Sequence, residues 1–547
     1  MSADAARASR PLVLGIDAST QSLTALAIDP EERAVVARES LGYDRDLPHW
    51  GTRGGQLPAD DPRLGRAPPA MWAEALDAVL GGLARRLADR AGGSLASVGA
   101  VSVAAQQHGS VCLRAGADRA LRELDPARPL AAQVEPLLAR AVAPIWTDAS
   151  TGAECRAIRE ALGGRAGAAR RTGSDVFERF TAPQIRRFAT RDPAGWEATG
   201  TVTLVSGFLT SLLLGAGAPL DHGDASGTAL MDLATRQWLP EALEATAPEL
   251  LRRLPPLVHP DTVVGTVSRF FIERHGLAPG CLVIAGTGDN PASAIGLGMV
   301  APGDLAVSLG TSDTCFALIE EGRVDESGQA HVFVAPTGDP MMLLCARNGS
   351  LARERVRDTY GLDWHGFARA IETTPPGNQG RLLLPWFEPE IVPRLERPWV
   401  ERLGGLDERD PAASCRAVVE AQMLSLAEHA RPLLGGLPGR DDGEPDRPRG
   451  RMLATGGAAA NPAVVQVIAD VFARPVEVLD GTDAAALGAA LRATHAWQRE
   501  LGHLASWPET TAGFTDRAGA LVEPSPGCRE AYAPLAAMLR EALRRIR

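Results

Sequence analysis

The sequence predicts a two-domain α/β protein, for three reasons. Its 547 residues are too many for one hydrophobic core of ordinary size. From 452 to 498, strand-like and helix-like segments alternate in a βαβα pattern. Two turns rich in Gly, Ser and Thr, each between apolar strand-like segments, lie about one domain apart, at 14–29 and 306–318. We therefore expect an N-terminal domain over 1–298 and a C-terminal domain over 299–547.

The N-terminal half is expected to hold several short strands, because short apolar runs there are bounded by turn residues. They are placed at 11–17, 23–29, 34–38, 98–104 and 281–285. The segment 70–90 has apolar residues at helical spacing and is predicted to be an amphipathic helix, whereas 44–69 is predicted to be a loop. A further helix is expected to begin at Pro291, directly after Gly286-Thr-Gly-Asp-Asn290.

The C-terminal half is expected to contain a strand at 452–454 and a glycine turn, Thr455-Gly-Gly457, followed by a helix from Asn461 to Ala473. The most apolar stretch of the whole chain, 204–220, is interrupted by Ser, Thr and Gly. It therefore predicts a buried helix and no membrane span.

Charge and cysteine content restrict the partners and the compartment. The formal net charge is −11, which disfavours nucleic acid and anionic membranes as partners, since both attract basic surfaces. The seven cysteines show neither C-x-x-C pairs nor metal-ligand spacing. Residues 1–10 are polar and lack the apolar core of a secretory signal. We expect buried free thiols and a cytoplasmic protein.

The two Gly/Ser/Thr turns are candidate phosphate-binding hairpins, because such turns offer backbone N–H groups and hydroxyls to phosphate oxygens. The carboxylate of Asp17, at the end of the first strand, is placed to hold Mg²⁺, although it also suits an ordinary turn residue. The chain contains no lysine. P-loop and protein-kinase sites both require one, so the sequence excludes both.

The order and spacing of the polar motifs resemble the FGGY family of sugar kinases, which belongs to the actin and Hsp70-like ATPase superfamily. The resemblance covers nearly the whole chain. It rests on Gly15-Ile-Asp-Ala-Ser-Thr-Gln21, Gln106-Gln-His-Gly-Ser110, Trp146-Thr-Asp-Ala-Ser150, Thr172-Gly-Ser with Glu178-Arg-Phe-Thr181, Asp224-Ala-Ser-Gly227, Gly288-Asp-Asn-Pro-Ala-Ser293, Ser308-Leu-Gly-Thr-Ser-Asp313, Asn348-Gly-Ser350 and Ala454-Thr-Gly-Gly457.

This resemblance implies two actin/Hsp70-like (ribonuclease H-like) domains flanking a catalytic cleft, with ATP and Mg²⁺ as cofactors. It is strongest to members that act on D-xylulose, particularly the eukaryotic form. The implied reaction is ATP-dependent phosphorylation of the terminal hydroxyl of D-xylulose by a monomer or homodimer. The alternatives are an FGGY kinase of another ketose or polyol, such as ribulose or glycerol, an actin-like or Hsp70-like ATPase switch, and a regulatory sugar-binding protein.

On the sugar side, the resemblance implies that Asp289 is the catalytic base and that His108, Arg179, Asp289 and Asn290 bind the substrate. One carboxylate can orient the hydroxyl and accept its proton. From the residues alone, Asp289 equally suits a cap for the helix expected at Pro291. His108 equally suits a structural histidine, and Arg179 a surface or ion-paired arginine.

On the nucleotide side, the expected contacts are turn residues and one aromatic ring. They are Thr20, Gly310, Thr311, Ser312, Gly456, Gly457 and Trp364. The glycines allow close approach of the backbone to a ligand, and the family resemblance implies that Trp364 lies on the adenine side, where its indole could stack. A core position suits Trp364 equally well.

Two other carboxylates lie in the quoted motifs. Asp224 is a rival for the catalytic base, although its Gly, Ser and Thr-rich surroundings favour an Asx-type turn near the substrate. Asp148 is expected to be structural. The roles of both residues, and of Asn461 after the glycine turn, are left open by the sequence.

Overall fold

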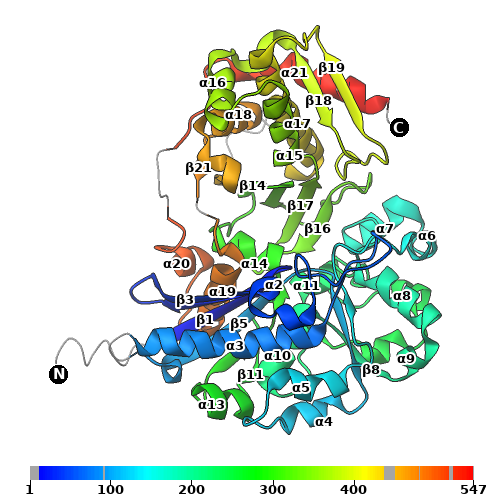
Figure 1. The fold of residues 1–547 in the computed structure, drawn as a ribbon, viewed down its shortest axis with the longest axis vertical. Coiled ribbons are helices and arrows are strands. Elements are labelled where there is room, and N and C mark those ends of the chain that lie inside the picture. Colours follow the sequence, from blue (N-terminus) through cyan, green and yellow to red (C-terminus); the bar gives the residue numbers. More distant parts are fainter. Residues whose placement is uncertain (1–10, 90–92, 436–449, 480, 517–520, 546–547) are drawn as a thin grey trace, which may run out of the picture. The chain divides into compact units, whose positions relative to one another are not determined.

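The computed structural model describes residues 11–89, 93–435, 450–479, 481–516 and 521–545 (Figure 1). The N-terminal segment 1–10 discussed above lies outside these residues. The chain folds into two compact units. The first takes in residues up to Val300, with 333–338 and 483–516, and the second takes in the rest. A segment from the C-terminal part of the sequence thus packs with the first unit, and the functional boundary at residue 298 stays a prediction.

The first unit is built on a mixed sheet in the order β11-β12-β5-β1-β2-β3, with β13 also paired to β5. Strands β1, β2 and β3 are antiparallel neighbours, whereas β1, β5 and β12 run parallel. The strands are β1 (Leu12–Ala18), β2 (Ser22–Asp29), β3 (Ala34–Gly42), β5 (Val98–Ala105), β11 (Val263–Thr266), β12 (Leu282–Ile284) and β13 (Thr287–Gly288). Short two-stranded pairs are formed by β4 (Arg66–Ala67) with β7 (Ala143–Pro144), β6 (Ser110–Arg114) with β8 (Thr199–Leu204), and β9 (Leu220–Asp221) with β10 (Leu257–Val258).

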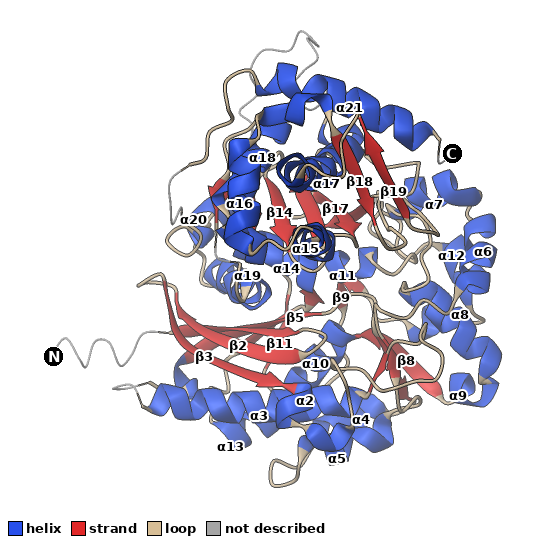
Figure 2. Ribbon diagram, turned by 45° about the horizontal axis from the view of Figure 1, so that its top comes forward, coloured by secondary structure: helices blue, strands red, loops and turns tan. Residues whose placement is uncertain are grey.

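Helices cover both faces of this sheet. Helix α3 lies against β2 and β3 on one face, and α19 lies against β1 and β5 on the other (Figure 2). The helices are α2 (Tyr43–Asp46), α3 (Pro69–Ala88), α4 (Ala117–Arg122), α5 (Leu130–Val134), α6 (Gly152–Ala161), α7 (Gly164–Thr172), α8 (Thr181–Arg191), α9 (Pro193–Glu197), α10 (Val205–Leu214), α11 (His222–Ser226), α12 (Pro240–Thr246), α13 (Arg269–His275), α14 (Asp289–Gly296), α19 (Ala484–Glu500) and α20 (Trp507–Thr511).

The second unit repeats this design around a sheet in the order β16-β17-β15-β14-β20-β21. This sheet consists of β14 (Leu305–Leu309), β15 (Asp313–Leu318), β16 (His331–Val334), β17 (Pro340–Ala346), β20 (Met452–Thr455) and β21 (Glu477–Val478), and residues 333 and 334 of β16 are grouped with the first unit. A separate ribbon is formed by β18 (Leu382–Trp386) and β19 (Trp399–Leu403). The helices of the second unit are α15 (Ser350–Thr359), α16 (Trp364–Thr373), α17 (Pro411–Leu434), α18 (Pro462–Phe472) and α21 (Cys528–Arg544).

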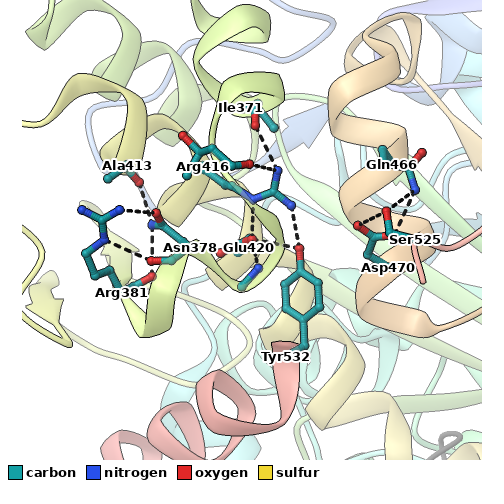
Figure 3. Close-up of polar contacts among 12 residues, drawn as sticks. Ile371, Asn378, Arg381, Ala413, Arg416, Glu420, Gln466, Asp470, Ser525 and Tyr532 are labelled. Atoms are coloured by element: carbon teal, nitrogen blue, oxygen red, sulfur yellow. Dashed lines mark hydrogen bonds and ion pairs between the residues drawn. The ribbon is translucent and has the colours of Figure 1, made fainter. Parts of the chain in front are cut away.

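A buried polar network fixes the C-terminal helix α21 in the second unit (Figure 3). The Arg416 guanidinium donates to Glu420 Oε1 at 2.6 Å and to Tyr532 Oη at 3.0 Å. The Tyr532 hydroxyl in turn donates to the same Glu420 oxygen at 2.8 Å. Because the partners lie on α17 and α21, the network joins segments that are far apart in the sequence, in agreement with the long-range core between them.

Several predicted elements are confirmed with shifted ends. Helix α3 buries the predicted apolar stripe, and α10 is the buried helix expected within 204–220. No helix among the described residues is long and apolar enough to cross a membrane. Strand β3 runs on to Gly42, and the loop predicted over 44–69 contains short helical turns and β4. Helix α14 begins at Asp289 and not at Pro291. All seven cysteines lie within the described residues and none is in a disulfide, and all but the half-buried Cys345 are buried.

Candidate active site

Asp17 lies at the end of β1, where the chain enters the first hairpin turn. The Ser19 hydroxyl donates to its Oδ2 at 2.5 Å, whereas its Oδ1 is buried and has no hydrogen-bond partner. The pKa of Asp17 is raised to about 7, mainly by burial; the Ser19 hydrogen bond opposes the rise, and the negative charges of Asp289 and Asp483 contribute to it. A buried carboxylate oxygen without a partner is costly, so this site fits a cation well.

The turn that follows is held from two sides. The Trp146 indole donates to Thr20 Oγ1 at 2.7 Å, and the Tyr43 hydroxyl donates to the Ser19 carbonyl at 3.3 Å. Thr20 itself is only partly buried. Its hydroxyl therefore accepts a bond from Trp146 and keeps its proton available for donation, as a phosphate contact requires.

Asp289 is the first residue of α14, whose N-cap is Gly288 and makes no side-chain cap bond. Asp289 therefore occupies the first helical position and not the N-cap position. Its Oδ1 accepts from the backbone N–H and the side-chain amide of Asn290, at 2.8 and 3.0 Å. Burial raises the pKa of Asp289 to about 6, and hydrogen bonds from Asn290 and Gln107 N–H groups limit the rise. The carboxylate is thus mostly ionised near neutral pH but basic enough to accept a proton.

Gln107 joins this carboxylate to the polar run after β5. Its Oε1 accepts from Asn290 Nδ2 at 3.0 Å, whereas its Nε2 is buried without a partner. Both side-chain polar atoms of Gln106 are also buried without a partner. Neither glutamine was predicted from the sequence to be a site residue, although both belong to the Gln106–Ser110 motif, which follows the end of an apolar strand. Unpaired buried amides beside a carboxylate suit a polyhydroxy ligand.

His108 is neutral in this environment. Its Nδ1 lies 2.7 Å from the Gly227 carbonyl, so Nδ1 carries the proton and Nε2 is the acceptor. The pKa of His108 is lowered to about 3, mainly by burial and also by the positive charge of Arg179, against the opposing hydrogen bond with Gly227. The Arg179 guanidinium lies 5.1 Å from the Phe177 ring centre. The structure therefore brings His108 and Arg179 together, with Nε2 able to accept from a hydroxyl.

Asp224 is buried inside α11 and is not the residue that caps it. The capping residue is Asp221, whose Oδ1 accepts the Asp224 N–H at 2.7 Å. The Asx-type turn predicted at Asp224 thus belongs to Asp221. The Ser206 hydroxyl bonds to Asp224 Oδ2, and burial and the Asp221 charge raise the pKa of Asp224 well above its usual range. A carboxyl that stays protonated is a poor general base, which favours Asp289.

Asp148 has a structural environment. Its Oδ1 accepts from Ser150 N–H at 3.0 Å and from Gln184 Nε2 at 2.9 Å, and Oδ2 accepts from Gly65 N–H at 3.3 Å. The side chain is 2% exposed. Because both carboxylate oxygens are occupied, Asp148 ties its own loop to the loop at Gly65 and to helix α8, and it needs no ligand.

The second hairpin turn, Gly310-Thr-Ser312, joins β14 and β15 in the second unit. Gly456 lies beside it with φ of +88°, and a Cβ there would approach the Leu309 carbonyl oxygen to 2.5 Å. Both the left-handed backbone and the contact require glycine at this position. The Gly456–Gly457 turn and the Gly310 turn are therefore adjacent, as a shared nucleotide site requires.

The remaining nucleotide-side residues differ in their surroundings. Trp364 begins α16 and is 44% exposed, with the Arg357 guanidinium 4.4 Å from its ring centre. It is thus no core tryptophan. Asn461 is the N-cap of α18 and accepts the Ala463 N–H at 3.0 Å, which gives it a structural role. Helix α16 packs against α18, so Trp364 and the glycine turn belong to neighbouring elements.

The predicted residues thus fall into two groups. Asp17, Thr20, His108, Arg179, Asp289 and Asn290 lie in the first unit, and Gly310, Thr311, Ser312, Trp364, Gly456 and Gly457 lie in the second. Among the described residues, no group of three or more His, Cys, Asp or Glu side chains could hold a metal ion. A cation at Asp17 would therefore take most of its ligands from water or phosphate, as Mg²⁺ commonly does.

Comparison with known families finds two matching domain models. The family model for the N-terminal domain of FGGY carbohydrate kinases matches residues 132–296, and the model for their C-terminal domain matches 305–497. The chain belongs to the FGGY family of carbohydrate kinases.

Similar proteins extend over almost the whole chain. Mouse xylulose kinase is 37% identical over 543 residues, covering 97% of this chain and 94% of that protein. Xylulose kinase 2 of Arabidopsis thaliana is 38% identical over 506 residues, covering 89% of this chain and 87% of that protein.

Solved structures share the fold at low sequence identity. A xylulose kinase from Bifidobacterium adolescentis has a TM-score of 0.72 at 24% identity, covering 96% of this chain and 99% of that one. Glycerol kinase of Plasmodium falciparum with ADP has a TM-score of 0.78 at 16% identity, covering 98% of each chain. The chain therefore has the two-domain actin/Hsp70-like fold of FGGY sugar kinases.

Proposed function

We propose that this protein catalyses the ATP-dependent phosphorylation of D-xylulose at its terminal hydroxyl, giving D-xylulose 5-phosphate and ADP. Full-length similarity to proteins named xylulose kinase supports the substrate. The observation that carries the chemistry is Asp289, a carboxylate with a pKa of about 6 that opens α14 beside unpaired buried amides.

In this proposal Asp289 accepts the proton of the sugar hydroxyl as its oxygen bonds to the γ-phosphorus, and ADP leaves with the electrons of the broken P–O bond. His108 Nε2 accepts a hydrogen bond from another sugar hydroxyl. The amides of Asn290 and Gln107 and the guanidinium of Arg179 orient the ketose, and Gln107 N–H keeps the Asp289 carboxylate in place. These contacts position the reacting hydroxyl.

We further propose that Asp17 holds Mg²⁺, mainly through water. The orphaned Oδ1 of Asp17 supports this proposal. When bound, the metal ion supplies positive charge to the phosphate oxygens. In the same proposal, Thr20 of the first unit and Thr311 and Ser312 of the second would each donate hydroxyl and backbone N–H bonds to nucleotide phosphates. Gly310, Gly456 and Gly457 would allow the nucleotide to approach the backbone closely, and Trp364 would contact the adenine.

The cellular setting is proposed on general properties. The net charge of −11 supports an enzyme that acts without nucleic acid or a membrane surface, and the free cysteines support a cytoplasmic location. A monomer or a homodimer is proposed. Phosphorylation of ribulose or glycerol is the second candidate function, because a glycerol kinase shares the fold.

We expect D-xylulose to give a far higher kcat/KM for ADP release than D-ribulose, xylitol or glycerol. A substrate analogue that leaves buried hydrogen-bonding groups of the site unpaired commonly has a kcat/KM lower by more than about a hundredfold. A coupled ADP-release assay over this panel measures the ratios. An equal or higher value for another ketose or polyol would refute xylulose as substrate and leave the kinase activity intact.

The pH dependence follows from the two raised carboxyl pKa values. Asp289 acts as a base and Asp17 as a metal ligand only when their carboxyl groups are ionised. As the pH falls, Asp17 loses its charge near a pH of about 7 and Asp289 near a pH of about 6. Bound Mg²⁺ favours the ionised form of Asp17 and lowers its pKa. At saturating Mg²⁺ we therefore expect kcat/KM to fall below a pH of about 6. A flat profile between pH values of about 5 and 8 would contradict Asp289 as the base.

A further inference from the structure

The second phosphate-binding hairpin lacks an obvious positive charge. The chain has no lysine, so a side chain that is positively charged at neutral and alkaline pH must be an arginine. The nearby Arg353 is not available: it forms a bidentate pair with Asp313 at 2.7 and 2.9 Å and also donates to Gln422 at 2.9 Å. Arg353 is 1% exposed. Its charge is neutralised inside the unit and cannot reach a ligand.

A second turn lies directly against this hairpin. Ser350 N–H donates to the Gly310 carbonyl at 3.0 Å, and a Cβ on Gly349 would approach the Thr311 carbonyl oxygen to 2.7 Å. Strand β17 pairs with β15 so that Ala346 faces Asp313. Arg347, the next residue, therefore leaves the sheet at the Ser312 end of the hairpin.

The backbone of Arg347 is held rigidly, whereas its side chain is exposed. The buried Glu390 carboxylate accepts N–H bonds from Arg347 at 2.5 Å and from Asn348 at 3.0 Å, and it also accepts from Asn348 Nδ2 at 2.8 Å. Within the described part of the chain, the Arg347 guanidinium has no carboxylate partner. A turn fixed through its backbone thus places Arg347, an exposed arginine without a carboxylate partner, at the Ser312 end of the hairpin.

We propose that Arg347 binds the β- and γ-phosphate oxygens of the nucleotide. The proposal rests on the proposed kinase function, since it assigns a charged contact within the same nucleotide site. A guanidinium offers paired N–H donors that match phosphate oxygens. Arg347 thereby supplies the charge that lysine supplies in P-loop proteins. Glu390 is a positioning residue, because it acts only through the 347–349 turn.

The test compares binding of ADP and of adenosine by isothermal titration calorimetry, using full-length Arg347→Met and Arg347→Lys variants. We expect Arg347→Met to weaken ADP binding about tenfold and Arg347→Lys to weaken it less, because one charge-assisted contact is lost or only partly replaced. Adenosine has no phosphate, so its affinity should stay within about twofold of wild type. Arg409→Met, at an exposed arginine in the loop before α17, serves as the matched control.

The outcomes separate the two proposals. ADP affinity within about twofold of wild type in Arg347→Met would overturn the role of Arg347. So would an equal loss of ADP and adenosine affinity, since that would show a distorted turn. A wild-type protein that binds neither nucleotide would refute the proposed function itself. Melting temperatures of the variants, measured without ligand, identify any that fail to fold.

Discussion

Replacing Asp289 with Asn is expected to lower kcat by about 10²- to 10⁴-fold while sugar and nucleotide still bind, because general-base catalysis typically contributes that much. Asn keeps the shape of the side chain and can still accept the Asn290 N–H bond, but it cannot take a proton. A coupled ADP-release assay gives kcat. Ligand-induced shifts in melting temperature show whether D-xylulose and ATP still bind.

Asp224→Asn is the matched control, because Asp224 lies in the same unit and its raised pKa keeps it protonated. An amide closely resembles a protonated carboxyl, so kcat should change by less than about tenfold. If folded Asp289→Asn keeps near-normal kcat, the assignment of the base is wrong. If Asp224→Asn alone abolishes turnover while both ligands still bind, the two roles must be exchanged.

The sequence predicted well those features that depend on local pattern. The two hairpins were found because apolar strands flank turns rich in Gly, Ser and Thr, and α3 was found from its helical spacing of apolar residues. The start of α14 was placed two residues late. Proline is tolerated anywhere in the first helical turn, where N–H groups have no intrahelical partner, so Pro291 fixes the start only approximately.

Features that depend on distant contacts could not be predicted. Asp221 and Asp224 are near neighbours in the sequence, and either position suits a cap, so only the fold shows that Asp221 caps α11. The bond from Trp146 to Thr20 joins residues 126 positions apart. Asp313 likewise cannot bind a cation, because its carboxylate is paired with Arg353, which lies on a different element, helix α15.

That pair distinguishes the two hairpins. Asp17 keeps an unpaired oxygen, whereas both oxygens of Asp313 are bound by Arg353 and both side chains are 1% exposed. Removing one partner leaves a buried charge without compensation. We therefore expect Asp313→Ala to destabilise the second unit by about 3–5 kcal/mol. Hydrogen exchange of the β14 and β15 amides measures this locally, since two-unit chains seldom unfold in a single step.

The double variant Asp313→Ala with Arg353→Met should recover much of the lost stability, because it removes the stranded charge and puts an apolar side chain in its place. Glu541→Ala provides the surface comparison: its pair with Arg544 is largely exposed, so its loss should cost less than about 1 kcal/mol. If Asp313→Ala were no more destabilising than Glu541→Ala, the buried pair would not be what fixes the second hairpin. The hairpin would then owe its shape to the Gly349 and Gly456 contacts alone.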